Sequence, residues 1–310
     1  MHKLPPELHH YICESACIED AASVHALNMV STYFHEVSKP YLYRTVAASG
    51  VQQVLALSER LAIIPPHLSR IHHLFLCDLP SQTKSNAHSA STHTEDSYKL
   101  LRCVVQILAH ASPTLQTLSL FSQSPISTAL IAKVFRTSFP VLRRLSIHGF
   151  YPFLSSPNRF PQLEYLHLNG NRNPSGLLQM WTLDDACPAL ETLRITGLSL
   201  AGSFVSEVED ALNQSGADED ALDSADDLSS PRLPAQLKSL IVQAGPLPDH
   251  GLGKVVSLKD KVMMNRLESL RSSRKGGLSV RVSVPERTLQ SLSVEDMKEE
   301  WFAGVVVYRS

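Results

Sequence analysis

A short apolar pattern recurs along this chain and strongly limits the folds that it can form. Five segments read Pro-x-Leu-x-x-Leu-x-apolar, and they begin at Pro113, Pro140, Pro161, Pro188 and Pro234. Their first leucines lie 27, 21, 27 and 47 residues apart, and the last copy is stretched by one residue. Ile71, Leu74 and Leu76 form a weaker sixth copy without the proline. Recurrence at such intervals indicates one structural unit built several times.

The last two apolar positions of each copy are two residues apart, so they are predicted to enter one core from a short strand. Leu-x-x-Leu-x-Leu at intervals of about 20–29 residues is typical of the strand half of a leucine-rich repeat. Apolar residues at helical spacing predict helices over Tyr98–Ala111 and Ile126–Thr137. The predicted fold is therefore α/β, a curved leucine-rich-repeat-like solenoid with a parallel sheet. An ordinary α/β sheet with leucine-rich strands is the alternative.

The C-terminal part is predicted to complete this array. Lys254–Arg274 has the pattern of a helix, and Leu278–Val284 alternates as a strand, so the two make a last repeat. The tail, Pro285–Ser310, contains Trp301, Phe302 and a predicted strand at Val305–Val307. We expect this tail to cap the open end of the solenoid.

Two segments interrupt the pattern. Residues 81–97 hold no large apolar side chain and are predicted to form a flexible insertion. Residues 205–230 carry nine acidic residues and no Lys or Arg, and their removal would restore a normal repeat interval. A solvated, self-repelling insertion is the simplest interpretation, and a docking strip for a basic partner is the alternative.

The bulk composition excludes several classes of partner. The net charge is −2 and the pI is about 6.7, which favours neither nucleic acid nor an anionic membrane surface. No stretch of about 18 apolar residues predicts a membrane span, and the first residues lack the apolar core of a secretory signal. The five cysteines are scattered and odd in number, which favours reduced thiols and a cytoplasmic or nuclear location.

A search for chemistry yields no catalytic, cofactor or metal site. The sequence contains no Gly-x-Ser-x-Gly, P-loop, Gly-x-Gly-x-x-Gly or His-Glu-x-x-His motif. His9, Cys13 and Cys17 could share one face of a helix, but no fourth ligand at the usual spacing lies near them. We therefore interpret all three as structural residues.

The first 46 residues form a unit of different character. An apolar stripe at Leu8, Ile12 and Ala16 predicts a first helix, and a second stripe runs from Val24 to Phe34. About 40 residues are too few for a secure core, so this unit is expected to lean on a partner or on the rest of the chain.

The residues of this unit resemble an F-box of the kind found at the N-terminus of fungal proteins, ahead of degenerate leucine-rich repeats. The resemblance is carried by Leu4-Pro5-x-Glu7-Leu8, Ile12, Leu27, Val30-Ser31, Phe34 and Tyr41–Val46. It implies two domains, an F-box-like helical unit over 1–46 and a repeat domain over 47–310.

The resemblance also implies a function without catalysis. F-box proteins bind the Skp adaptor, and through it the cullin, of an SCF-type ubiquitin ligase, while their repeats bind a protein target. Leu4, Pro5 and Leu8 would then contact the adaptor, and Ile12, Val30 and Phe34 would lie at that interface or support it. Alternatively, all six residues merely build the core of the helical unit.

Two other functions remain open at this stage. One is an F-box and repeat scaffold that acts by protein–protein interaction outside a ligase. The other is an enzyme, for example a hydrolase, which would need a deep pocket lined by converging polar side chains.

Overall fold

The computed structural model describes most of the chain. The described residues are 4–19, 21–79, 93–124, 126–151, 157–178, 182–214, 231–245, 254–270, 278–283 and 293–307. The chain divides into two compact units, one made of residues 1–137 and 292–310 and the other of residues 138–291. The division at residue 46 predicted from the sequence stays a prediction.

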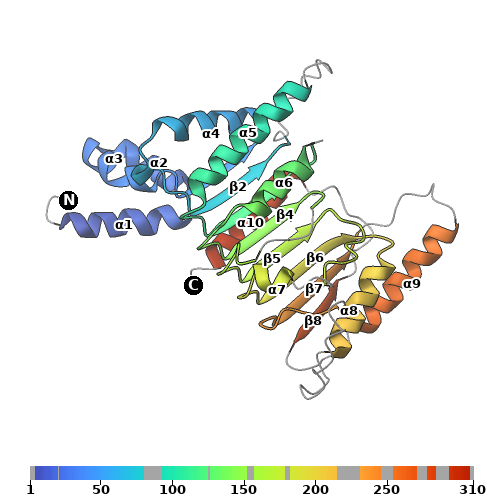
Figure 1. Ribbon diagram of the computed structural model, residues 1–310. Coiled ribbons are helices and arrows are strands. Elements are labelled where there is room, and N and C mark those ends of the chain that lie inside the picture. Colours follow the sequence, from blue (N-terminus) through green and yellow to red (C-terminus); the bar gives the residue numbers. More distant parts are fainter. Residues whose placement is uncertain are drawn as a thin grey trace. The chain divides into compact units, whose positions relative to one another are not determined.

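The first unit begins with helices and continues with alternating strands and helices (Figure 1). Its elements are α1 (Pro6–Glu19), α2 (Ala21–Val30), α3 (Thr32–Ser38), η1 (Lys39–Tyr41), β1 (Thr45–Ser49), α4 (Val51–Ile63), η2 (Pro66–Leu68), β2 (His73–Cys77), α5 (His93–Ala111), β3 (Thr117–Phe121), α6 (Ser127–Arg136) and α10 (Val294–Val307). Strand β2 lies between β1 and β3, and both pairings are parallel.

The second unit repeats the alternation of strand and connection. Its elements are β4 (Arg144–His148), β5 (Tyr165–Asn169), α7 (Thr182–Ala186), β6 (Thr192–Leu198), α8 (Gly202–Gln214), β7 (Ser239–Ala244), α9 (Lys254–Leu270) and β8 (Ser279–Ser283). The five strands pair in chain order, and every pairing is parallel. The predicted α/β class with parallel strands is therefore confirmed.

The repeated leucines form the core of both units. Leu118 on β3 pairs with Leu74 on β2, while Leu145, Leu166, Leu193 and Leu240 occupy one register position across β4 to β7. All five repeat leucines are 0–1% exposed. The prediction that these leucines are buried on adjacent parallel strands is confirmed within each unit.

Glycines allow the loops that follow the strands of the second unit to pack closely. Gly170 has a φ of +134°, and a Cβ atom on it would lie 2.1 Å from the carbonyl oxygen of Gly149. The amide of Gly149 in turn donates to the carbonyl of Asn169 at 2.8 Å. Any larger residue at position 170 would therefore clash with the neighbouring backbone.

The prediction of a flexible insertion over 205–230 is wrong for its first part. Residues 205–214 belong to α8, which lies beside α9 (Figure 1). Val205, Val208 and Leu212 are buried at helical spacing, so apolar burial outweighs the local charge. Glu209 is paired with Arg266 on α9, which offsets part of that charge. Residues 215–230 lie outside the described residues.

Glu207 has a structural function inside this acidic helix. Its side chain is buried, and Oε1 accepts hydrogen bonds from the Ser175 hydroxyl at 2.8 Å and from the Gly176 amide at 2.7 Å. We expect Glu207→Ala to lower the free energy of unfolding by about 2 kcal/mol, because the variant loses a buried side chain that accepts two hydrogen bonds. Urea denaturation with Asp210→Ala, an exposed acid on the same helix, as the control measures this loss. Equal stability of the two variants would contradict it.

Two further predictions need correction. Residues 93–97 begin α5 instead of ending a flexible insertion, and residues 81–92 lie outside the described residues. The predicted strand at 305–307 is the end of helix α10, in which Val294, Met297 and Val305 are buried. This helix belongs to the first unit, where it packs on β2. Its apolar residues recur at helical spacing, which outweighs the strand preference of three adjacent valines.

Candidate functional site

The N-terminal helices are joined by a small set of buried contacts. His9 is buried on α1, and its Nδ1 lies 2.8 Å from the Tyr33 hydroxyl on α3. The His9 ring also meets the edges or faces of the Tyr33 and Phe34 rings, with centroids 5.3 and 5.6 Å away. Cys13, one turn further along α1, is fully buried. These contacts hold α1 against α3.

Hydrogen bonds at the helix ends complete this unit. The Pro5 carbonyl accepts from the amides of Leu8 and His9 at 3.0 and 3.3 Å, so Pro5 directly precedes the first turn of α1. Ser31 begins α3, because its hydroxyl accepts from the Phe34 amide at 3.2 Å. At the other end of α3, the Ser38 hydroxyl donates to Asn28 Oδ1 on α2 at 2.6 Å.

An ion pair connects the helical unit to the first strand. The Arg44 guanidinium lies 2.6 Å from the Glu14 carboxylate on α1, and most of the Arg44 side chain is buried. The Arg44 carbonyl then accepts from the amide of His73 at 2.9 Å, at the start of the β1–β2 pairing. Arg44 thus links α1 to the sheet of the first unit.

Five of the six residues predicted to bind the adaptor are exposed. Leu4, Pro5, Leu8, Ile12 and Val30 are exposed, and Phe34 is partly buried. Leu8 and Ile12 are each 46% exposed and lie one turn apart on α1, and Leu4 precedes them by another turn. Phe34 contacts His9 and Tyr33, so it supports the unit from inside.

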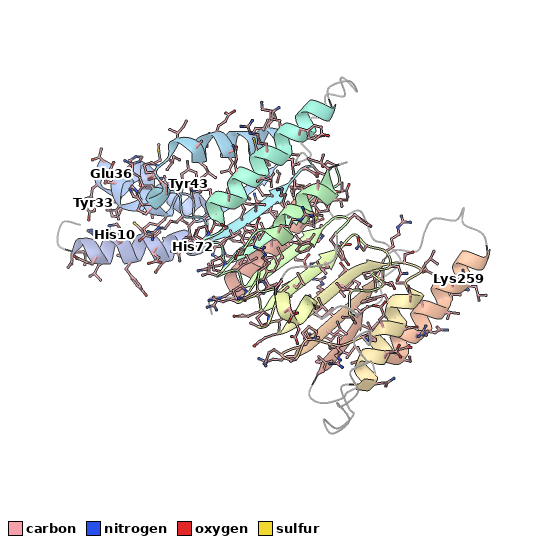
Figure 2. The ribbon with its side chains drawn as sticks, viewed as in Figure 1. His10, Tyr33, Glu36, Tyr43, His72 and Lys259 are labelled. Carbon is pink, nitrogen blue, oxygen red and sulfur yellow. The ribbon has the colours of Figure 1, made fainter. Side chains whose placement is uncertain are left out.

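Three further apolar residues are exposed but are not part of the F-box motif. Tyr11, Met29 and Tyr33 are also exposed, and Met29 reaches 88%. Tyr11 and Met29 directly precede Ile12 and Val30 in the sequence, and Tyr33 precedes Phe34. The sequence pattern marks the apolar stripes but cannot show that neighbouring apolar residues also stay outside the core. Figure 2 labels Tyr33 and His10 on this unit.

This patch is unusual within the described chain. Seven large apolar side chains are exposed between residues 4 and 33, namely Leu4, Leu8, Tyr11, Ile12, Met29, Val30 and Tyr33. Six more, Ile63, Tyr98, Phe150, Leu200, Leu258 and Val262, are spread over all the other described residues. We call the seven the N-terminal apolar patch. A concentration of exposed apolar side chains in one part of a chain is typical of interaction surfaces, so these seven residues are the candidate site.

The structure also bears on the possible metal ligands His9, Cys13 and Cys17 and on membrane spans. His9 and Cys13 are buried, and His9 bonds to Tyr33, while the Cys17 side chain is not described. Nowhere in the described ranges do three or more His, Cys, Asp or Glu side chains gather around a possible ion position. None of the described helices is long and apolar enough to cross a membrane.

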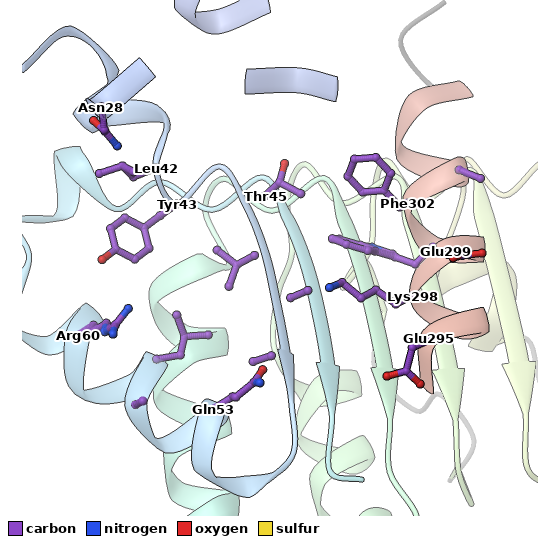
Figure 3. A pocket seen from close by; sticks show the side chains of 17 residues that line it. Asn28, Leu42, Tyr43, Thr45, Gln53, Arg60, Glu295, Lys298, Glu299 and Phe302 are labelled. Atoms are coloured by element: carbon purple, nitrogen blue, oxygen red, sulfur yellow. The ribbon is translucent and has the colours of Figure 1, made fainter. Parts of the chain in front are cut away.

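The first unit also contains a groove with a volume of about 1110 Å³ beside strand β1 (Figure 3). Its walls come from α4 and from α10, and Figure 3 shows Thr45 and Phe302 near one end and Gln53 and Glu295 near the other. Five of its polar side chains are exposed, namely Gln53, Arg60, Glu295, Lys298 and Glu299. The groove therefore presents charged side chains that are exposed to solvent.

In the second unit, polar side chains occupy the sheet face opposite the repeat leucines. The Arg144 guanidinium lies 4.1 Å from the centre of the Tyr165 ring. His148 and His167 are both buried, with ring centroids 4.9 Å apart, and His167 Nε2 lies 2.9 Å from the Thr196 hydroxyl. Burial lowers the pKa of His167 well below its ordinary value, and the charges of His148, Arg194 and Arg144 lower it further.

This histidine predicts a dependence of stability on pH. The unfolded chain binds a proton at His167 near pH 6.5, whereas the folded chain resists protonation there. The free energy of unfolding should therefore fall below about pH 6.5, by up to about 1.4 kcal/mol per pH unit, until the folded state also binds the proton. Urea denaturation at several pH values should show a smaller slope for His167→Gln. An exposed-residue control, His67→Gln, should keep the wild-type slope.

The sequence was also compared with models of known protein families and with curated proteins. No family model matches it, and no curated protein matches it. The functional conclusions therefore depend on the residues and their geometry.

Proposed function

We propose that this chain is the substrate-recognition subunit of an SCF-type cullin-RING ubiquitin ligase. In this proposal residues 1–46 act as an F-box that binds the Skp adaptor, and residues 47–310 form a leucine-rich-repeat-like solenoid that binds a protein target. The chain would supply two binding surfaces, and the other subunits would carry out ubiquitin transfer. The observation that carries the proposal is the N-terminal apolar patch.

The patch supports adaptor binding for an energetic reason. Burying apolar surface contributes about 25 cal/mol per Å², so half-exposed leucine and isoleucine side chains leave stabilisation unused in the isolated chain. His9, Cys13 and Val37, in contrast, are buried inside the helical unit. The exposed positions Leu4, Leu8 and Ile12 are also those that the F-box resemblance assigns to the adaptor.

The experiment is a quantitative co-purification from a fungal host that expresses the tagged full chain. A ligase subunit should bring down both the Skp adaptor and the cullin. Adaptor without cullin would favour the scaffold function, and neither protein would reject both. Point variants suit this experiment better than removal of residues 1–46, because β1 begins at Thr45 and Arg44 bonds to His73.

A matched pair of variants makes the co-purification specific. Leu8→Ala with Ile12→Ala removes two side chains of the patch, and Ile63→Ala removes an exposed isoleucine on α4 of the same unit. The double variant should lose the adaptor, and Ile63→Ala should retain it. Equal recovery of the adaptor with both variants would contradict the proposed interface.

A further inference from the structure

Strand β1 has one unpaired edge within the described residues. It pairs only with β2. Two backbone hydrogen bonds, one at each end of the strand, show which residues of β1 bond to β2. The Arg44 carbonyl accepts from His73 at 2.9 Å, and the Gly50 amide donates to Cys77 at 2.8 Å. In a parallel pair every second residue bonds to the neighbouring strand. The backbone groups of the intervening residues, Thr45, Ala47 and Ser49, therefore point away from β2.

The hydrogen bond of Ser49 agrees with this assignment. Its amide donates to Gln53 Oε1 on α4 at 2.9 Å, away from β2. Across the described ranges, no hydrogen bond is formed by the outward N–H and C=O groups of Thr45 and Ala47. An edge of this kind is a template for a further strand.

The groove described above encloses this edge. Thr45 and Ala47 line it, between residues of α4 on one wall and of α10 on the other (Figure 3). Two buried side-chain atoms on its lining, Thr45 Oγ1 and Trp301 Nε1, also find no hydrogen-bond partner among the residues that the structure describes. Buried polar groups without partners are rare in folded proteins, so their position here points to a ligand with polar groups of its own.

We propose that the groove binds an extended peptide segment of a partner protein, which adds a strand to the open edge of β1. Only a polypeptide backbone presents donors and acceptors with a two-residue repeat of about 6.6 Å, which matches Thr45 and Ala47. The partly exposed rings of Trp301 and Phe302 would receive an apolar side chain of the segment. That the segment belongs to a ligase target rests on the proposed function; the binding mode itself does not.

Three substitutions test the site in the full chain. Ala47→Pro removes one outward N–H, which β2 does not use, and an edge strand tolerates proline at such a position. Ala56→Lys places a long charged side chain on the α4 wall of the groove, where Ala56 is exposed. Gln52→Lys makes a comparable change at an exposed position of α4 that does not line the groove.

The probe is a displayed library of random peptides, selected on the purified full chain without the adaptor. We expect enriched peptides to bind Ala47→Pro and Ala56→Lys about 10-fold or more weakly, and Gln52→Lys as tightly as the wild type. The amides of Thr45 and Ala47 should exchange with deuterium more slowly when the peptide is bound. If Ala47→Pro does not fold, Ala56→Lys and the exchange measurement decide alone.

Three outcomes would overturn the proposal. They are the absence of any enriched peptide, equal binding to Ala56→Lys and Gln52→Lys, and peptide binding that leaves exchange at Thr45 and Ala47 unchanged. Because the adaptor is absent from this experiment, each outcome is independent of the proposed function. A failure of adaptor binding would likewise leave the peptide measurement intact.

Discussion

Replacing Leu193 with alanine is expected to lower the free energy of unfolding by about 2–5 kcal/mol. Leu193 lies on β6 and occupies the same register position as Leu166 on β5 and Leu240 on β7, and all three are fully buried. Removal of its branched side chain leaves a cavity between two neighbours that β-sheet pairing prevents from closing in. Denaturation in urea, followed by circular dichroism, measures the loss.

A surface leucine provides the control for this experiment. Leu258 lies on α9 of the same unit and is exposed, so Leu258→Ala should change the free energy of unfolding by less than about 0.5 kcal/mol. Leu145→Ala should behave like Leu193→Ala, since Leu145 is equally buried at the same register position. A loss below about 1 kcal/mol in both core variants would show that the repeated leucines do not form the main core.

The double change Leu8→Ala and Ile12→Ala is expected to weaken binding of the Skp adaptor by about 30-fold or more. Truncating a central apolar side chain at an interface typically costs about 2 kcal/mol, which corresponds to that factor. The chain itself should stay folded, because both side chains are about half exposed and alanine is a good helix former. Titration with purified adaptor, beside a thermal melt, measures both effects.

Two controls separate binding from folding in that titration. Ile63→Ala should leave adaptor binding unchanged, because Ile63 lies outside the N-terminal apolar patch. Val37→Ala, in contrast, should destabilise the helical unit, since Val37 is buried on α3. A collapsed melt in the Leu8 and Ile12 variant would show that these residues are structural.

The sheet could be predicted from the sequence because its core depends on local spacing alone. Two apolar residues at alternate positions, followed by a helical stretch, specify a strand with one buried face whatever lies next to it. The strands that carry Leu118, Leu145, Leu166, Leu193 and Leu240 therefore appear where the pattern places them.

The errors arise where local charge or residue preference conflicts with periodicity. The acidic run suggested a solvated insertion, yet Val205, Val208 and Leu212 give its first part an apolar face that packs in the core. The valines at 305–307 suggested a strand, although Val294, Met297 and Trp301 already follow helical spacing. In both segments the burial of an apolar helix face determines the structure. Charged residues on the opposite face stay in solvent and cost little free energy.

Of the two candidate sites, the sequence predicted residues of one and gave no indication of the other. The motif names Leu8 and Ile12, and their spacing on α1 is enough to place both on one face of that helix. The groove beside β1 combines α4, β1 and α10, so residues about 250 positions apart in the sequence meet there. No local pattern marks such a site, because it depends on how α10 packs against β2.

A calorimetric titration of the purified full chain with purified Skp adaptor tests the central claim most directly. We expect saturable one-to-one binding with a Kd of about 1 μM or tighter, and a loss of most of this affinity in the Leu8→Ala, Ile12→Ala variant. Absence of binding, or equal affinity in the wild type and this variant, would contradict the assignment of the N-terminal helices as an adaptor-binding F-box.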